Sequence, residues 1–246
     1  MLVSYDRCSL GHRDKITVHS IHFNVCVAKP VQGQEKDTNP KAQEALKKEW
    51  DRLQAIGTWD IKSVREKDDG EKEARNNKTT AHIGRIFDMC VIKNEELPED
   101  DPRRKYKGRV VFQGNNVKDQ NWDAAMFQEL SSCPATMQAA KAADCFGMVE
   151  GHDVQQADAE QAYTQALLGG VPTWVIIPKK RWPQEWIDAG YRNPVCRLVK
   201  ALYGHPDSGG YWEQHCERHL IKCGFAPIRE RRSCYWNAKL QLLLCL

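Results

Sequence analysis

The sequence has 246 residues and lacks any long hydrophobic run; its mean hydropathy is -0.65. Because a membrane-spanning helix needs roughly 18 consecutive apolar residues, the sequence excludes a membrane bundle. The opening segment, MLVSYDRCSLGHRDK, lacks the apolar core of a secretory signal. We therefore expect an intracellular protein, cytoplasmic or nuclear, that is not secreted and that contacts no membrane.

A strong net charge and closely paired cysteines are also missing. The 36 Lys and Arg residues nearly balance 33 Asp and Glu residues, which excludes a histone-like coat on nucleic acid but still allows a local basic surface. The ten cysteines include no C-x-x-C pair, so we expect most of them to be reduced thiols.

Several signatures of catalysis are absent as well. There is no phosphate-binding loop ending in Gly-Lys-Ser/Thr and no G-x-S-x-G elbow. A zinc site is disfavoured, because His215, His219 and Cys223 are strung over two turns of an expected helix and do not converge on one tetrahedral ion. What is present, 41% hydrophobic and 28% charged residues, is typical of one large or two small globular domains.

Local patterns predict a mixture of helices and strands. The clearest helix covers residues 39–57, with Asn39 as N-cap, Pro40 as first helical residue and Gly57 at the end. Apolar runs predict a long hairpin from residues 86–93 and 105–113. Further helices are expected at 135–144, 160–168 and 211–222, and further strands at 18–27, 148–157, 174–177 and 240–246.

Three stretches have a less regular pattern. Residues 1–38 are predicted to be a tail or linker, and residues 65–80, which are charged and have no apolar face, a solvated loop or a frayed helix. The sequence stops inside the apolar run 240–246, where an unpaired strand edge would invite aggregation. We therefore expect a break inside a hairpin, although a natural C-terminal strand is the alternative.

The segment from Arg103 to Val111 contains the strongest local electrostatic signal. If it is a strand, Lys105, Lys107 and Arg109 share one face, and Lys93 on the partner strand could add a fourth cation. Such a row suits a polyphosphate or a nucleic-acid backbone. A charged edge strand that resists aggregation explains the residues equally well.

Asp158 stands where an extended run changes into a helical one. A carboxylate at the end of a strand is well placed to hold Mg²⁺, which prefers oxygen ligands. On the residues alone the favoured alternative is that Asp158 caps a helix beginning at Glu160.

Five motifs in this order resemble the reverse transcriptase region of copia-type retrotransposon polyproteins, over a span from about Lys41 to Leu246. The motifs are Glu49-Trp50 with Leu53 and Thr58-Trp59; Lys105-Tyr106-Lys107-Gly108-Arg109-Val110-Val111; Asp158-Ala159-Glu160-Gln161-Ala162-Tyr163 followed by Leu168-Gly169; Val195-Cys196-Arg197-Leu198-Val199-Lys200-Ala201-Leu202-Tyr203-Gly204; and Trp212 with Gly224-Phe225.

This resemblance implies an α+β fold with the fingers and a partial palm of a reverse-transcriptase-like polymerase, truncated at its C-terminus. Residues 1–38 would be a tail or linker, 39–147 the fingers-like part with the hairpin, and 148–246 the partial palm. The implied reaction is RNA-directed DNA synthesis by two-metal nucleotidyl transfer. The implied partners are an RNA template, a DNA primer and a dNTP, and the implied cofactor is Mg²⁺.

The resemblance also implies roles for individual residues. Asp158 would be the catalytic aspartate that binds the metal, and the Ala159 carbonyl would be a further contact. Tyr163 would crowd the sugar of the incoming nucleotide and reject a 2′-hydroxyl. The remaining implied roles fall to cations: Arg109 and Lys93 would hold the triphosphate, and Lys105 and Lys107 the nucleic-acid backbone.

Two departures from the family pattern modify this expectation. Asp207 stands where the family has a glutamine that contacts nucleotide and template, which puts that contact in question. The family's Tyr-x-Asp-Asp block is not reached, and one aspartate cannot hold two ions in geometry. We therefore expect a polymerase fragment without activity. The alternatives are a non-catalytic nucleic-acid or nucleotide-binding remnant and a decayed gene product without function.

Overall fold

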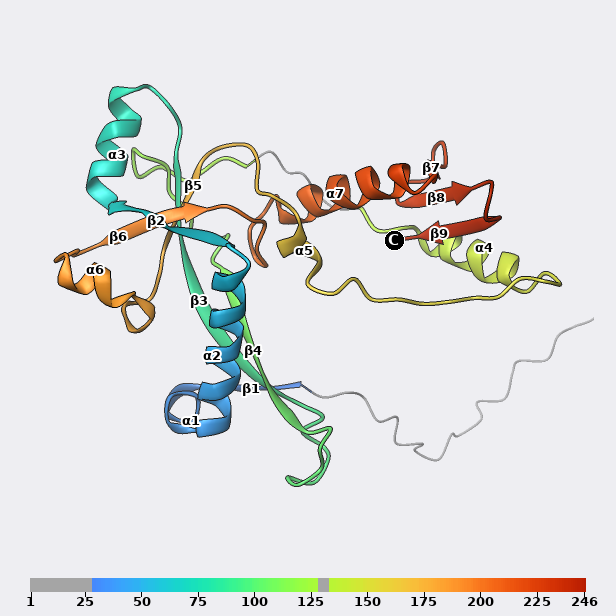
Figure 1. Ribbon diagram of the computed structural model, residues 1–246, viewed down its shortest axis with the longest axis horizontal. Helices are drawn as coiled ribbons and strands as arrows, with labels where there is room; N and C mark the ends of the chain where they lie inside the picture. The colour runs from blue at the N-terminus through green and yellow to red at the C-terminus, as the bar shows by residue number, and fades with distance from the viewer. Residues whose placement is uncertain (1–27, 128–132) are drawn as a thin grey trace, which may run out of the picture.

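The computed structural model describes residues 28–127 and 133–246 (Figure 1). The strand expected at residues 18–27 lies outside this range. The described chain forms two sheets accompanied by helices, as expected for an α+β protein. No helix in residues 28–127 and 133–246 is long and apolar enough to cross a membrane.

The larger sheet contains six strands. They are β1 (Ala28–Val31), β2 (Trp59–Glu66), β3 (His82–Lys93), β4 (Lys105–Phe112), β5 (Thr173–Ile176) and β6 (Pro194–Leu198). The longest strand, β3, pairs antiparallel with β1 and β4 and parallel with β5. The order along the sheet is β1-β3-β5-β6-β2, and β4 pairs with β3 alone.

The long hairpin predicted from the sequence is confirmed as β3 and β4. Its register runs from Ile86 opposite Phe112 to Lys93 opposite Lys105. Helix α2 (Pro40–Ala55) covers one face of this hairpin (Figure 1). A Cβ atom on Gly108 would lie 2.5 Å from the Ala45 carbonyl oxygen, so only glycine lets the helix backbone approach β4 this closely.

Helix α2 is also the helix that the sequence predicts most clearly. The Asn39 side chain accepts hydrogen bonds from the amides of Lys41 and Ala42, and Pro40 occupies the first turn. The second half of its apolar stripe, Trp50 and Leu53, enters the main core, and the first half, Ala42 and Leu46, packs in a smaller cluster. The main core draws residues from both halves of the sequence. Its most deeply buried residues include Leu53, Ile86, Val110, Phe112, Val175 and Leu198.

A buried carboxylate ties several elements together beside β3. Asp88 accepts a hydrogen bond from Trp50 Nε1 at 3.1 Å and lies 3.1 Å from Lys36 Nζ, with Lys180 and Arg181 at 3.4 and 3.6 Å. Burial acts to raise the pKa of Asp88, but the hydrogen bonds from Trp50 and Lys36 and the neighbouring positive charges outweigh it and lower the pKa. Asp88 is therefore a charged structural anchor.

Residues 28–38 correct the prediction of a tail or linker. They form β1 and helix α1 (Gly33–Thr38). Strand β1 adds to the edge of β3, and Val31 is buried in a small cluster with Leu46 and Ile92. A four-residue strand gains its stability from this pairing, which the local sequence does not reveal.

Residues 65–80 are more ordered than the predicted loop or frayed helix. They contain the end of β2 and helix α3 (Lys67–Asn76). Lys67 and Glu71 are buried and form an ion pair at 3.3 Å. Trp122 donates its Nε1 hydrogen to Glu71, and Lys67 Nζ lies 3.3 Å from the centre of the Trp122 ring. Helix α3 has no apolar face of its own, and Trp122, which is distant in the sequence, packs on its buried ion pair instead.

The next group of elements contains α4 (Met137–Gly147), α5 (Ala162–Gln165), α7 (Ser208–Lys222), β7 (Ala226–Pro227), β8 (Cys234–Asn237) and β9 (Leu242–Cys245), with the strands in the order β7-β8-β9. Most of these elements lie at one end of the molecule, and α5 lies between them and the larger sheet (Figure 1). We call residues 133–165 and 208–246 the second unit. Residues 28–127 and 166–207, which also contain the 3-10 helix η1 (Lys179–Arg181) and α6 (Gln184–Asp188), form the sheet unit.

The division of the chain at residue 147 differs from this arrangement. Strands β5 and β6 come after residue 147 but belong to the six-stranded sheet, whereas α4 comes before it and packs in the second unit. The chain therefore passes between the two units more than once, because strand pairing and not sequence order decides which segments pack together.

Two local predictions in the second unit are wrong. Residues 148–157 form no strand: residues 152–159 are exposed and have no ladder partner in the described chain. The helix predicted at 160–168 is reduced to α5, because Gln161 has a φ of 55° before it and Ala166 is extended after it. The predicted strand at 240–246 and the helix at 211–222 are present as β9 and α7.

Candidate functional site

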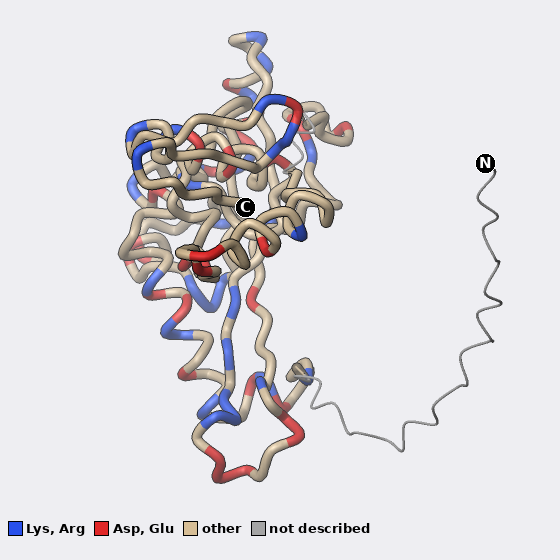
Figure 2. Tube along the Cα trace, turned by 90° about the vertical axis from the view of Figure 1, so that its right-hand side faces the viewer, with Lys and Arg blue, Asp and Glu red and all other residues tan. Residues whose placement is uncertain are grey.

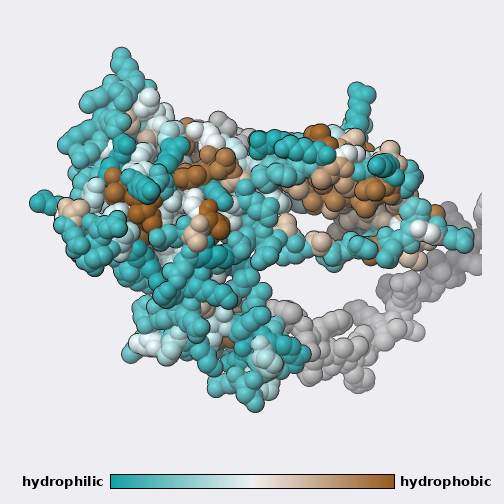
Figure 3. Space-filling model, viewed as in Figure 1, coloured by the Kyte–Doolittle hydropathy of each residue, from teal (hydrophilic) through white to brown (hydrophobic). Residues whose placement is uncertain are grey.

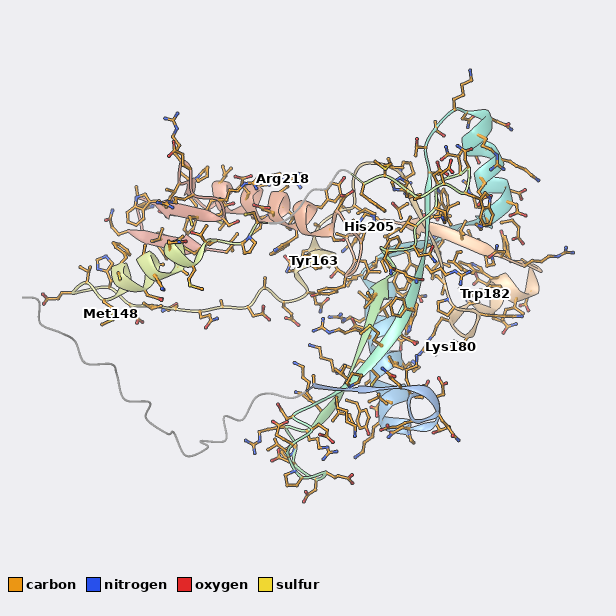
Figure 4. The ribbon with its side chains drawn as sticks, turned by 180° about the vertical axis from the view of Figure 1, so that it is seen from behind. Met148, Tyr163, Lys180, Trp182, His205 and Arg218 are labelled. Carbon is orange, nitrogen blue, oxygen red and sulfur yellow. The ribbon has the colours of Figure 1, made fainter. Side chains whose placement is uncertain are left out.

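A cleft of about 640 Å³ lies where the second unit meets the sheet unit. Five residues predicted from the sequence line it together: Lys107, Arg109, Asp158, Ala159 and Tyr163. Strand β4 supplies the two cations, the segment before α5 supplies Asp158 and Ala159, and α5 itself supplies Tyr163. In Figure 4, Tyr163 lies at the junction of the two units, whereas Met148 lies at the far end of the second unit.

The cations on β4 lie on the hairpin face opposite the one that α2 covers. Lys107 and Arg109 alternate with the buried Gly108 and Val110, as the strand periodicity predicts. Partial burial and the neighbouring charges of Lys93 and Arg109 lower the pKa of Lys107. A bound anion would reduce the repulsion between these positive charges, so this wall of the cleft favours an anionic ligand.

The outer end of the cation row lies beyond the cleft. Lys93 and Lys105 are opposite each other in the hairpin register and do not line the cleft. Within the described residues, none of the four cations Lys93, Lys105, Lys107 and Arg109 forms an ion pair. Figure 2 shows Lys and Arg residues along the hairpin and α2, with acidic residues gathered at the hairpin tip.

An aromatic pair forms the wall beside Arg109. The rings of Tyr163 and Tyr203 are 4.8 Å apart in an edge-to-face arrangement, and the Arg109 guanidinium lies 5.4 Å from the Tyr203 ring centre. Sequence reasoning included Tyr203 in a motif but did not assign it to the site. The sequence feature that could have pointed to Tyr203 is the glycine after it. Gly204 has a φ of 86°, and a Cβ atom there would lie 2.1 Å from the Phe112 carbonyl oxygen, so this turn requires glycine.

Helix α2 contributes two further residues that the sequence analysis did not assign to the site. Glu49 and Arg52 form an ion pair at 2.7 Å and both line the cleft. They stand three residues apart on α2, a spacing that marks a helical pair but does not reveal a shared cleft. The far wall, from the second unit, includes Trp212 and Glu213.

Asp158 lines the cleft but does not cap a helix. Helix α5 begins at Ala162, and its N-cap residue, Gln161, forms no side-chain cap. The capping alternative for Asp158 is therefore wrong. The Asp158 side chain is exposed in the extended stretch before α5, with Glu160 close by in the sequence.

The carboxylates in this cleft do not fit a two-ion magnesium site. In the part of the chain that the structure describes, no group of three or more His, Cys, Asp or Glu side chains is placed to hold a metal ion. Two Mg²⁺ ions need several converging oxygen ligands. Magnesium binding therefore stays a prediction from the sequence.

Asp207, which the sequence analysis singled out as a departure, does not line the cleft. It is buried beside His205, whose Nδ1 accepts a hydrogen bond from the Asp207 amide at 3.2 Å. The next residue, Ser208, donates its hydroxyl to the Leu202 carbonyl at 2.7 Å. The His205-to-Ser208 turn thus serves to fold the start of α7.

Comparisons with protein-family models, with curated proteins and with solved structures find no match for this chain. The geometry of the cleft and the sequence motifs that line it are the features that indicate a function.

Proposed function

We propose that this chain is part of a copia-type RNA-directed DNA polymerase, made of its fingers and a portion of its palm, and that its cleft binds a deoxynucleoside triphosphate. One observation carries the proposal. Arg109 comes from one motif, Asp158 and Tyr163 come from another that lies far from it in the sequence, and all three residues line one cleft. The motif order predicts this meeting, and an accidental resemblance would not.

Each wall of the cleft matches one part of a nucleotide. Arg109 and Lys107 offer fixed positive charge, and a guanidinium can bind two phosphate oxygens at once. Tyr163, held edge-on against Tyr203, offers a rigid surface for the sugar. Asp158 and Ala159 line the same cleft and would supply a carboxylate and a carbonyl oxygen.

The intact polymerase would join a nucleotide to the 3′-oxygen of a primer and release pyrophosphate. Magnesium would supply activation of that oxygen and charge for the leaving group. The described carboxylates do not provide both ion sites, so nucleotide binding without synthesis is the expected property of this chain. We expect no primer extension on a poly-rA/oligo-dT template, and extension above background would contradict this.

A second candidate function is binding of a nucleic-acid backbone along the hairpin. The observation that favours it is the exposed face shared by Lys105, Lys107 and Arg109, with Phe87 and Met89 beside them on β3. Cations can neutralise phosphates, and exposed apolar side chains can contact bases. This function requires no carboxylate.

Equilibrium dialysis with labelled dTTP tests the nucleotide proposal. Loss of a charged hydrogen bond costs about 1.5–3 kcal/mol, so Arg109→Ala should weaken binding roughly tenfold or more. Arg103→Ala is the matched control: Arg103 lies on the same hairpin but is paired with Asp101 outside the cleft. Equal weakening by both variants would show that only the net charge matters and would overturn the proposal.

A salt titration separates the two candidate functions. If a nucleic-acid backbone lies along the hairpin, an RNA–DNA duplex should bind with a strong salt dependence, and Lys105→Ala should reduce the slope by about one ion. dTTP binding in the cleft should be unaffected by Lys105→Ala, because Lys105 does not line it. A chain that binds neither ligand and shows no cooperative melting would fit a decayed gene product.

A further inference from the structure

Two cysteines lie directly opposite each other in the small sheet of the second unit. Cys234 in β8 and Cys245 in β9 are register partners, and their sulfur atoms are 3.8 Å apart. All cysteines in the described residues are free thiols. This pair is distinct because the backbone ladder itself holds the two side chains together.

The hydrogen bonds next to the pair define its type. The Leu246 amide donates to the Ser233 carbonyl at 2.8 Å, so residues 233 and 246 form a hydrogen-bonded position. Because positions alternate in an antiparallel ladder, Cys234 and Cys245 occupy a non-hydrogen-bonded position, where Cα atoms are typically about 4.5 Å apart. This separation lies within the range over which a disulfide can form.

We propose that Cys234 and Cys245 are a redox modification site that closes to an intrachain disulfide when the protein meets a peroxide. The sulfurs must approach from 3.8 Å to roughly 2.0 Å, a movement that side-chain rotation can supply within an intact ladder. The proposal does not rest on the proposed function of the cleft.

The reaction has two balanced steps. The partly exposed Cys245 thiol attacks a peroxide oxygen, so that hydrogen peroxide is reduced to water and Cys245 becomes a sulfenic acid. The Cys234 thiol, which is only 3% exposed, then attacks the Cys245 sulfur; the S–S bond forms, the S–O bond breaks, and the hydroxyl leaves as water with the thiol proton.

The surroundings of the pair allow only slow oxidation near neutral pH. Burial, followed by the hydrogen bond and charge of Cys234, raises the pKa of Cys245 to about 11. A small thiolate fraction near neutral pH limits the rate of the first step. Cys234 is within reach once the sulfenic acid forms, and this proximity favours the disulfide over further oxidation.

The disulfide would fix one wall of the cleft. Ser233 precedes Cys234, Leu246 follows Cys245, and both line the cleft. The Leu246 carbonyl accepts a hydrogen bond from the Ala135 amide at 2.7 Å, which joins β9 to the start of α4. Cross-linking β8 to β9 therefore restrains the segment that supports this wall.

Mass spectrometry of the whole chain, before and after hydrogen peroxide at about pH 8.5, tests the proposal by using the larger thiolate fraction there. The expected product has lost two hydrogen atoms, about 2 Da, and non-reducing digestion should yield one linked pair containing Cys234 and Cys245. Reduction should restore both thiols. This mapping uses the native sequence and does not depend on the folding of any variant.

Variants and a stability measurement complete the test. Cys234→Ser should abolish the linked pair, whereas Cys223→Ser, at an exposed cysteine, should leave it unchanged. Because the pair lies in the second unit, closing the short loop should slow hydrogen exchange in β8 and β9 of the oxidised chain and leave the amides of the sheet unit unchanged. A native chain that keeps both thiols free, forms overoxidised Cys245, or links either cysteine to another partner under these conditions would overturn the proposal.

Discussion

The sheet unit and the second unit bury their residues very differently. Phe112 and the other deeply buried side chains of the main cluster belong to the sheet unit. In the second unit, α4 buries no residue, and α7 buries only Ser208 and Gly210. Figure 3 shows a hydrophobic area exposed along the second unit. Leu240, Leu242 and Ile221 of this unit are exposed.

This difference indicates where the stability of the molecule comes from. Apolar burial is the main favourable term in folding, so the sheet unit supplies most of the free energy of unfolding. The second unit has few buried apolar contacts and should open at lower cost. One wall of the cleft, with Arg109 and Tyr203, is therefore firmly supported, whereas the wall with Trp212 and Leu246 is weakly supported.

The largest expected effect comes from truncating the core of the sheet unit. Phe112 is 1% exposed, and replacing a buried phenylalanine by alanine removes transfer free energy and leaves a cavity. We expect Phe112→Ala to lower the free energy of unfolding by about 3–5 kcal/mol. Urea unfolding followed by circular dichroism measures this loss.

The matched substitution in the second unit should have little effect. Ile221 on α7 is 52% exposed, and changes at such positions are usually within about 0.5 kcal/mol. If Ile221→Ala and Phe112→Ala destabilise the chain to a similar extent, the second unit has a core of its own and the contrast between the two units is wrong.

The next effect is a loss of stability in acid that originates in the sheet unit. His205 packs against the rings of Phe112 and Phe127, and burial followed by the nearby charge of His82 lowers its pKa from 6.5 to about 4. Because the folded-state pKa is below the unfolded value, the stability is fully present above about pH 6.5 and is lost as the pH falls towards 4. The loss should reach about 3 kcal/mol.

Denaturant titrations at a series of pH values measure this effect. His205→Gln, which carries no charge at any of these pH values, should flatten the stability profile between about pH 6.5 and 4. His219→Gln is the control in the second unit, since His219 is exposed on α7. A profile that stays steep in the His205 variant would assign the acid sensitivity to another group.

The sequence predicts elements well where the signal is local. The cap and stripe of α2 and the alternation in β3 and β4 are complete within their own segments. It fails where a distant partner decides the outcome: α3 needs Trp122, β1 needs β3, and residues 152–159 lack a ladder partner in the described chain. Propensity cannot report a contact that only the fold creates.

The residues of the candidate site show the same contrast between local signals and contacts that only the fold creates. The resemblance assigns roles to Arg109, Asp158 and Tyr163, which line one cleft, and to Lys93, which does not. It did not place Asp207 in the interior or assign Arg52 and Tyr203 to the cleft, because burial and ring packing depend on several elements at once.

The smallest effect compares one helix cap from each unit. Asn39 caps α2, and its Nδ2 also donates to the Tyr106 hydroxyl at 3.0 Å. Thr136 caps α4 through a single hydrogen bond from the Ala139 amide at 3.2 Å. Removing either cap should cost about 1 kcal/mol, and Asn39→Ala should cost more because two interactions are lost.

The two cap variants should also differ in how far the damage spreads. Because α2 belongs to the main core, Asn39→Ala should lower the protection of all slowly exchanging amides in the sheet unit. Thr136→Ala should increase hydrogen exchange only in α4 and leave the urea midpoint nearly unchanged, because α4 buries no residue. If Thr136→Ala shifts the midpoint as much as Asn39→Ala does, both units unfold as one cooperative body, and the weakly supported wall of the cleft is as stable as the other.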